Sequence, residues 1–180
     1  MIPQIIHTDS FVYKAYPSMT KEESYLIWEA RNNEEIRKYL TNPQPFSFEQ
    51  HLAFVNKLKD RDDALFYAVI KDDEVVGSIC LNPYDKDTKE GEMGKYLFPQ
   101  FGGKGLGYLF AKEFLNYMFA NGILMTCLAR TFVDNLRNQH VNNKLGFVET
   151  QRDDRYVYMK LCKSLKYSGF VRGGGATRQI

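Results

Sequence analysis

Apolar residues along the chain fall into short runs and into longer stretches with helical spacing. Short runs bounded by turn residues indicate strands, and capped stretches with apolar positions three or four apart indicate helices. The predicted strands are 11–15, 65–70, 75–81, 92–98, 125–132, 147–150 and 156–161, and the predicted helices are 20–32, 34–40, 47–59, 108–119 and 135–145. The pattern therefore predicts a mixed α/β sheet flanked by helices.

Local signals set several boundaries of these elements. Thr20 and Glu23 have the spacing of a capping box, and Ser47 is a second helix cap. The pair Asp72-Asp73 between two strand-like runs predicts a hairpin, whereas residues 82–89 are expected to form a loop. We expect one domain over residues 1–165 and a flexible tail over residues 166–180.

The densest cluster of glycines occurs between a strand-like run and a helix-like run. Gly102, Gly103, Gly105 and Gly107 fall within six residues. Glycines can adopt positive φ and leave N–H groups free to point at one anion beside a helix N-terminus, so the segment is typical of a phosphate-binding loop. A glycine-rich turn without a ligand is the alternative.

Spacing excludes two common phosphate motifs. A P-loop needs Ser or Thr after its Gly-Lys pair, and here Gly105 follows Lys104. The Rossmann motif needs a third glycine where this chain has Tyr108 or Phe110. The pattern Q-x-x-G-x-G, formed by Gln100, Gly103 and Gly105, instead resembles the pyrophosphate loop of the GCN5-related N-acetyltransferases (GNAT).

A second segment carries the same resemblance. Residues 135–147 are similar to the family segment N-x-x-[SA]-x-x-x-Y-x-K-x-G-F, with Asn135, Lys144, Gly146 and Phe147 on pattern. The segment has the features of a short helix capped by Asp134 or Asn135, with Leu136, Val141 and Leu145 facing inward and Gly146 ending it. The resemblance covers residues 65–162 well and the first 64 residues more loosely.

The resemblance implies the GNAT fold and acetyl-CoA as the cosubstrate, with no metal. In that fold two neighbouring parallel strands, here 92–98 and 125–132, splay apart, and the pantetheine chain lies between them. The implied cofactor-binding residues are Tyr96, Leu97, Phe98, Gln100, Gly102, Gly103, Lys104, Gly105, Leu106, Gly107 and Asn135. Asn135 is alternatively a plain helix cap, and both roles are compatible.

Acetyl transfer to an amine needs a base, a group that polarises the carbonyl and an acid for the departing thiolate. Glu92 matches the acidic position of the family's Glu-x-Gly segment and is the candidate catalytic base, acting directly or through a water. Glu90 is a weaker candidate, and a solvent-facing Glu92 paired with a lysine is the alternative interpretation. A backbone N–H near Leu97 or Phe98 would polarise the carbonyl.

The chain differs from the family pattern at the residue that would act as the general acid. The pattern's tyrosine is replaced by Asn142, and an amide can accept or donate a hydrogen bond but cannot give up a proton to a thiolate. Either another tyrosine serves, or the thiolate leaves unassisted, which a thiol pKa of about 8.5 permits. The GNAT branch that modifies ribosomal-protein N-termini often lacks this tyrosine too.

The first third of the chain bears on the acceptor. Residues 28–32, Ile36 and residues 48–54 are similar to sugar-nucleotide amine acetyltransferases of the pseudaminic acid pathway. That resemblance implies Arg31, His51 and Tyr96 as substrate-binding residues. The chain also differs from those enzymes at one place. Their Thr-Lys pair is replaced here by Cys80-Leu81, which removes a charged group that would contact phosphate.

Each acceptor residue has an alternative role. Arg31 can simply cap the end of a helix, and a lone histidine such as His51 is more often a surface or satisfied residue. Tyr25, Tyr39 and Tyr84 are further candidates for lining the acceptor cleft. The predicted reaction is acetyl transfer by direct attack of a primary amine, first of a nucleotide-linked amino sugar. A protein N-terminus and a non-catalytic acyl-CoA-binding module are the alternatives.

Composition narrows the partners. A net charge of +2 with scattered basic residues argues against a nucleic-acid-binding face. Cys80, Cys127 and Cys162 are too far apart for a zinc cluster and are expected to be buried reduced thiols of a cytoplasmic protein. No apolar run is long enough to predict a membrane span. A small-molecule amine is the expected partner, and the chain is expected to be a monomer or a homodimer.

Overall fold

The structure is a computed structural model that describes residues 2–164, so the tail predicted for residues 166–180 lies outside the described residues. The strands are β1 (Ile5–His7), β2 (Val12–Ala15), β3 (Leu65–Lys71), β4 (Glu74–Asp85), β5 (Glu90–Leu97), β6 (Thr126–Phe132), β7 (Val148–Arg152) and β8 (Tyr156–Cys162). The helices are α1 (Lys21–Asn32), α2 (Glu34–Arg37), α3 (Phe48–Lys57), α4 (Leu106–Ala120) and α5 (Leu136–Leu145), with 3₁₀ turns η1 (Tyr16–Ser18), η2 (Leu58–Asp60) and η3 (Pro99–Phe101).

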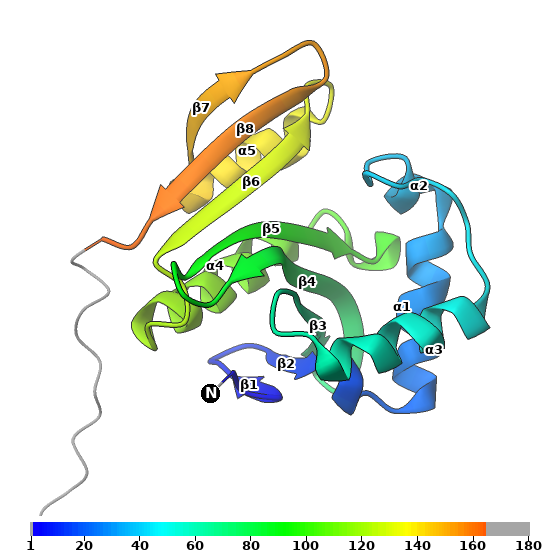
Figure 1. Ribbon diagram of the computed structural model, residues 1–180. Coiled ribbons are helices and arrows are strands. Elements are labelled where there is room, and N and C mark those ends of the chain that lie inside the picture. Colours follow the sequence, from blue (N-terminus) through cyan, green and yellow to red (C-terminus); the bar gives the residue numbers. More distant parts are fainter. Residues whose placement is uncertain (1, 165–180) are drawn as a thin grey trace, which may run out of the picture.

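The strands form one eight-stranded sheet in the order β1-β2-β3-β4-β5-β6-β8-β7. Neighbouring strands are antiparallel except for β5 and β6, which are parallel. Figure 1 shows β6, β8 and β7 tilting away from β5, so that the sheet opens between β5 and β6. The mixed α/β sheet predicted from the sequence is confirmed.

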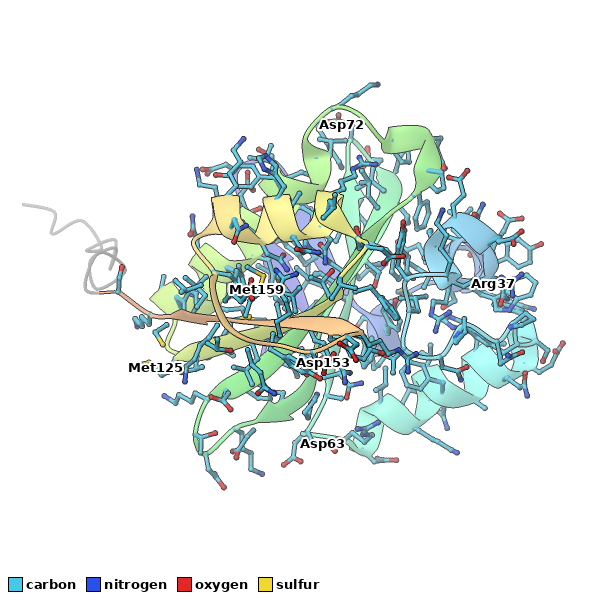
Figure 2. The ribbon with its side chains drawn as sticks, turned by 90° about the horizontal axis from the view of Figure 1, so that it is seen from above. Arg37, Asp63, Asp72, Met125, Asp153 and Met159 are labelled. Carbon is cyan, nitrogen blue, oxygen red and sulfur yellow. The ribbon has the colours of Figure 1, made fainter. Side chains whose placement is uncertain are left out.

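The two faces of the sheet are covered by different helices. One core cluster joins the sheet to α4 through Phe110, Phe114 and Met118. A second cluster joins the other face to α1, α2 and α3 through Ile27, Ile36 and Val55. Figure 2 shows α3 and α5 on opposite sides of the sheet, with Met159 of β8 on the α5 side. Within the described range, none of the helices combines the length and apolar content that a bilayer crossing requires.

Local chemistry explains the predicted boundaries. The Thr20 hydroxyl accepts the Glu23 amide at 3.1 Å, and the Glu23 carboxylate accepts the Thr20 amide at 2.7 Å, which completes the predicted capping box of α1. Ser47 caps α3 as predicted, in a capping box with Gln50. Asp72 and Asp73 both have positive φ and join β3 to β4 in the predicted hairpin.

The structure corrects three sequence boundaries. β1 was not predicted, because it is only three residues long and is fixed by its pairing with β2. β4 continues to Asp85 rather than ending at residue 81, so the predicted loop of residues 82–89 begins later. A register shift between Leu81 and Tyr84 accommodates Pro83, which cannot donate a ladder hydrogen bond. The short helix predicted for residues 34–40 ends at Arg37.

The cysteines do not share one environment. Cys127 of β6 is buried, as expected, and Cys80 of β4 is partly buried. Cys162 at the end of β8 is exposed, contrary to expectation. Residue 162 closes an apolar run in the sequence, but it is the last residue of its strand, where packing against the core has ended.

Candidate active site

The gap between β5 and β6 is the central feature of the candidate site. The two strands pair at Glu90 with Thr126, Gly91 with Cys127 and Glu92 with Leu128, and no pairing continues beyond Glu92. β5 nevertheless runs on to Leu97 and β6 to Phe132. The predicted splay of two neighbouring parallel strands is therefore confirmed.

Strand geometry decides which main-chain groups of β5 face the gap. The Phe98 amide donates to the Val76 carbonyl of β4 at 2.9 Å, so it is not available to a ligand. Successive residues of a strand direct their N–H and C=O groups to opposite sides, so the groups of Leu97 and Lys95 point toward β6. Of the two amides predicted to polarise a carbonyl, Leu97 fits and Phe98 is wrong.

The glycine loop supplies free N–H groups at the end of β5. Gln100 is exposed within η3. The Gly102 amide donates to the Pro99 carbonyl at 3.0 Å, so it is not free to bind a phosphate. Gly103 and Gly105 have φ values of 82° and 71°, and Gly105 caps α4. Within residues 2–164, no acceptor is recorded for the amides of residues 103–107. These amides lie at a helix N-terminus, where an anion is stabilised.

The space around the loop fits such an anion. A Cβ atom at Gly103, Gly105 or Gly107 would meet no protein atom within 4 Å, so neighbouring protein atoms do not explain these glycines. Positive φ explains Gly103 and Gly105, whereas Gly107 lies in the first turn of α4 and has no such requirement. The Arg137 guanidinium of α5 lies 4.0 Å from the Cβ position of Gly102 and adds positive charge at the loop. Lys104 is exposed within the loop.

Helix α5 confirms one role of Asn135. Its side-chain oxygen accepts the Asn138 amide at 3.1 Å, so Asn135, and not Asp134, is the N-cap. Gly146 ends the helix with φ of 95°, as predicted. Leu136 was predicted to face inward, but 71% of its surface is exposed, because the inward positions of α5 are taken by polar residues such as Asn142. Contact of Asn135 with the cofactor stays a prediction.

Asn142 and Asn138 of α5 hold a lysine that the sequence motifs did not single out. The Lys95 ammonium donates to the Asn142 oxygen at 2.7 Å and to the Asn138 oxygen at 2.9 Å. Asn138 in turn donates to the Thr131 hydroxyl of β6 at 3.0 Å. Burial lowers the pKa of Lys95 to about 8, because it disfavours the charged form. The signal available in the sequence was Asn142 itself, since a polar residue in the tyrosine position needs a partner.

Glu92 lies at the last paired rung, where β5 leaves β6. Its carboxylate is 3.4 Å from the guanidinium of Arg130 on β6, and both side chains are partly buried. The predicted alternative of a lysine partner is therefore wrong, because the partner is an arginine. Gly94 and Tyr96 follow on the same face, since side chains alternate along a strand. A Cβ at Gly94 would lie 2.8 Å from the Cys80 sulfur, so this position admits no side chain without movement of Cys80.

The three predicted acceptor residues converge on Tyr16 of η1. The ring of His51 lies 6.1 Å from the ring of Tyr16. Arg31 and Tyr96 both interact electrostatically with the Tyr16 hydroxyl, which hydrogen-bonds to Ser78 of β4 at 2.6 Å. These residues come from α1, α3, β4, β5 and η1, so the tertiary fold brings them together. The sequence did not single out Tyr16 or Ser78, because their contacts depend on elements far apart in the chain.

Unpartnered polar atoms mark this cluster. Four buried side-chain atoms of the described residues have no hydrogen-bond partner: Arg31 Nη1, Arg37 Nε, His51 Nε2 and Tyr96 Oη. Three of the four belong to the predicted substrate-binding residues. Burial raises the pKa of Tyr96 to about 12 and lowers the pKa of His51 to about 4, so both side chains are neutral at pH 7. Leaving such atoms unpaired costs free energy that a bound ligand can recover.

The tyrosines named as further candidates have different positions. The Tyr84 hydroxyl donates to the Ile123 carbonyl at 2.8 Å and its ring is in the α4-side core, so Tyr84 does not line the cluster around Tyr16. Tyr25 is exposed and packs against Trp28 and Phe48 beside His51. Tyr39 lies 6.5 Å from the Phe132 ring at the end of β6.

Comparison with known proteins gives one family and several distant relatives. The family model described as Acetyltransferase (GNAT) domain matches residues 18–148. Acetyltransferase PseH of Campylobacter jejuni subsp. jejuni serotype O:23/36 (strain 81-176) is 27% identical over 156 residues, which is 84% of this chain and 96% of PseH.

Two solved structures show the likeness in three dimensions. Campylobacter jejuni PseH in complex with acetyl coenzyme A has a TM-score of 0.70 at 24% identity, over 86% of this chain and 99% of PseH. RimL, a ribosomal L7/L12 alpha-N-protein acetyltransferase in complex with coenzyme A, has a TM-score of 0.76 at 16% identity, over 88% of this chain and 97% of RimL. At these identities the structures establish a shared fold.

Proposed function

Because the chain belongs to the GNAT acetyltransferase family, we propose that it transfers acetyl from acetyl-CoA to the primary amine of a nucleotide-linked amino sugar. The acceptor is the specific part of this proposal. A small-molecule amine, rather than nucleic acid or a membrane, is the partner that the cluster around Tyr16 suits.

The glycine loop and the gap would hold the acetyl donor. Free amides of residues 103–107 and the N-terminus of α4 suit a pyrophosphate, with Lys104 and Arg137 adding charge. The groups of Lys95 and Leu97 that point toward β6 suit the amides of a peptide-like chain. When bound, acetyl-CoA supplies a thioester that is reactive toward amines.

Two groups of the chain would act on the reacting atoms. The Leu97 amide would donate a hydrogen bond to the carbonyl oxygen and stabilise the negative charge that develops there. Glu92, on the acceptor side of β5, would accept a proton from the amine, directly or through a water. The ion pair with Arg130 holds Glu92 beside the opening of the gap. Cys80 lies near Glu92, and burial raises the pKa of its thiol to about 12, so the thiol stays protonated at pH 7. A protonated thiol is a poor nucleophile, which favours direct attack of the amine over an acetyl-cysteine intermediate.

The unpartnered atoms of Arg31, His51 and Tyr96 are the observation that carries the acceptor assignment. Arg31 lies on α1 with its guanidinium over the Phe46 ring. Its Nη2 donates to the Asn42 carbonyl at 2.9 Å, its Nη1 has no partner, and among the described residues no carboxylate pairs with it. A guanidinium in that setting suits the diphosphate of a nucleotide, because its fork donates two parallel hydrogen bonds. Neutral His51 and Tyr96 add hydrogen-bonding atoms without adding charge. The resemblance of residues 28–32, Ile36 and residues 48–54 to sugar-nucleotide amine acetyltransferases supports the same assignment.

The replacement of the Thr-Lys pair by Cys80-Leu81 affects this proposal. Leu81 is fully buried in the α4-side core and does not face the cluster around Tyr16. These two positions of β4 therefore offer no charged group to a phosphate, and Arg31 is the charged side chain among the three predicted acceptor residues. Substitution of Arg31 is therefore the most direct test of whether the acceptor carries a phosphate.

The experiment compares three amine acceptors. Purified protein is assayed with acetyl-CoA and a free amino sugar, the same sugar linked to a nucleoside diphosphate, and a peptide with a free N-terminus. We expect the nucleotide-linked sugar to have the highest kcat/KM. Preference for the peptide would support protein N-terminal acetylation instead, and equal rates with both sugars would remove the nucleotide from the proposal.

A matched pair of variants tests the role of Arg31. Arg31→Gln should raise KM for the nucleotide-linked sugar about 10- to 100-fold, because hydrogen bonds to a charged group contribute about 1.5–3 kcal/mol. The Kd for acetyl-CoA should be unchanged. Arg61→Gln is the control, since Arg61 pairs with Asp63 on the exposed surface. An unchanged KM in Arg31→Gln would exclude Arg31 from acceptor binding.

A further inference from the structure

The main chain of Lys95 faces the gap, but its side chain has no role in the proposed function. It lies on β5 beyond the last pairing with β6, and its side chain is on the opposite face from Glu92, because side chains alternate along a strand. Its ammonium is bonded to Asn138 and Asn142 of α5, and Asn138 is bonded to Thr131 of β6. The ammonium thus belongs to a network that connects β5, α5 and β6 where the strands part.

The partners of this ammonium are neutral. An ammonium has three N–H donors, and two of them are taken by amide oxygens. Within residues 2–164 the Lys95 ammonium has no carboxylate partner. The titratable group that acts on it is the Cys127 thiol of β6. Burial raises the pKa of this thiol, so the thiol is neutral at pH 7. A partly buried cation without an anion is costly, so it favours an anion that forms beside it.

We propose that the Lys95 ammonium is the proton donor to the coenzyme A thiolate that leaves during acetyl transfer. In this step the acceptor nitrogen bonds to the acetyl carbon and the carbon–sulfur bond breaks. The sulfur takes one proton from Lys95, which leaves a neutral amine and a neutral thiol. The proton lost by the acceptor nitrogen goes to Glu92, and exchange with water restores both residues.

The network explains why the chain can lack the family's tyrosine. Asn142 stands at the tyrosine position and cannot supply a proton, but its oxygen holds the group that can. Asn138, one helical turn earlier, provides the second oxygen and fixes the direction of the ammonium. The proton donor is thereby moved from α5 to β5 while it stays at the same gap.

The acidity of Lys95 suits the transfer. Its pKa of about 8 leaves the ammonium form dominant at pH 7. A thiol has an ordinary pKa of about 8.5, so proton transfer from Lys95 to the thiolate is close to balanced, which is the condition for efficient general acid catalysis. An ordinary exposed lysine, with a pKa of about 10.4, would be a weaker acid.

Steady-state kinetics provide the first test, which rests on the acetyl transfer of the proposed function but not on its acceptor. Any primary amine that the enzyme acetylates therefore serves. Lys95→Met should lower kcat at least about 100-fold, the lower end of general acid catalysis, with little change in the Kd for acetyl-CoA. Lys95→Arg should be equally slow, because a guanidinium does not release its proton. Lys57→Met on exposed α3 is the control.

The pH profile separates proton donation from a structural role. In the unmodified enzyme kcat should fall above about pH 8, where Lys95 loses its proton. That fall should be absent from the residual activity of both Lys95 variants. Adding Asn142→Tyr to Lys95→Met should restore activity and place the fall near pH 10, the ordinary pKa of tyrosine being about 10. A structural lysine would not be replaced by a phenol in this way.

A measurement without turnover keeps the inference testable if no acceptor is found. Coenzyme A is bound to the protein, and the ultraviolet absorbance of its thiolate is followed with pH. The Lys95 ammonium should stabilise the thiolate, so the apparent pKa of the bound thiol should rise by about one unit or more in Lys95→Met. Equal thiol titrations in both proteins would overturn the inference, as would a Lys95→Met kcat within about threefold of the unmodified value, far short of the effect of general acid catalysis. If Lys95→Met does not fold, Lys95→Gln is measured in the same way.

Discussion

At the scale of single residues, His51 shows how burial changes what a side chain can do. Only 3% of its surface is exposed, and its ring stacks on Phe48 with 6.2 Å between ring centres. The sequence alternative of a surface or satisfied histidine is wrong, because the Nε2 atom is both buried and unpartnered. Burial lowers the pKa of His51 to about 4, so the side chain stays neutral in the folded protein above that pH.

This burial predicts a specific loss of stability in acid. In the unfolded chain His51 binds a proton near its ordinary pKa of about 6.5, whereas the folded protein binds it only near pH 4. Between these values the unfolded state holds more protons, so the free energy of unfolding should fall as the pH falls from about 6.5 to about 4. Denaturant unfolding at several pH values measures this slope.

His51→Gln should flatten the slope in this window, and the same change at exposed His140 should not. If both variants kept the slope of the unmodified protein, the pKa of His51 would have to be the same in the folded and the unfolded chain. The lowering of its pKa by burial would then be excluded.

Residue roles were predictable from sequence to different degrees. Gln100, Gly103 and Gly105 were singled out by their spacing, and the structure places them together before α4. Their contact with phosphate stays a prediction. Lys95 was missed, because its role depends on two asparagines 43 and 47 residues away that only the packing of α5 brings to it. The same holds for the ion pair of Glu92 with Arg130 across two strands.

At the scale of elements, the junction of the glycine loop and α4 combines a backbone requirement with a space requirement. Gly105 has positive φ, so replacing it would strain the fold as well as any ligand site. Gly107 is helical and has open space around its Cβ position. The two requirements can therefore be separated by experiment at Gly107.

Gly107→Ala should make the fold slightly more stable and acetyl-CoA binding weaker. Alanine raises helix stability by up to about 1 kcal/mol relative to glycine, whereas its methyl group would enter the space beside the free amides. Thermal unfolding and calorimetric titration with acetyl-CoA measure the two effects. Ala120→Gly at the other end of α4 is the control, which should lower stability and leave affinity unchanged. Unchanged affinity in Gly107→Ala would place the phosphates elsewhere.

Elements defined by local chemistry were predicted, and those defined by pairing were not. The capping box of α1 and the turn at Asp72 and Asp73 depend on residues within four positions of each other. β1 and the extension of β4 to Asp85 exist because a neighbouring strand is present to pair with them. A sequence pattern carries no record of that neighbour.

At the scale of the whole molecule, the open sheet joins two differently built faces. The helices α1 and α3 bring the predicted acceptor residues Arg31 and His51 to one face, and α4 and α5 lie with the loop and the Lys95 network on the other (Figure 1). The splay that connects them was expected from the resemblance and not from periodicity. Strand spacing in the sequence does not reveal where two strands stop pairing.

Hydrogen exchange should detect the open edge of β5. The amides of Lys95 and Leu97 point toward the gap and should exchange faster than that of Phe98, which donates to Val76. Acetyl-CoA at about 100 times its Kd should slow the two exposed amides about 100-fold, because only the free fraction exchanges. Measurement by NMR with and without the ligand tests this. Slow exchange at Leu97 in the free protein would mean that the strands are closed there.

The position of Glu92 and Lys95 on opposite faces of one strand has a consequence for timing. In the proposed reaction the nitrogen would lose its proton on one side of the sheet and the sulfur would gain one on the other, so the two exchanges with solvent would not share a route. Neither substrate would then have to pass the other to arrive or depart. The proposed roles therefore predict a random order of binding, with each product leaving from the side by which its precursor came in.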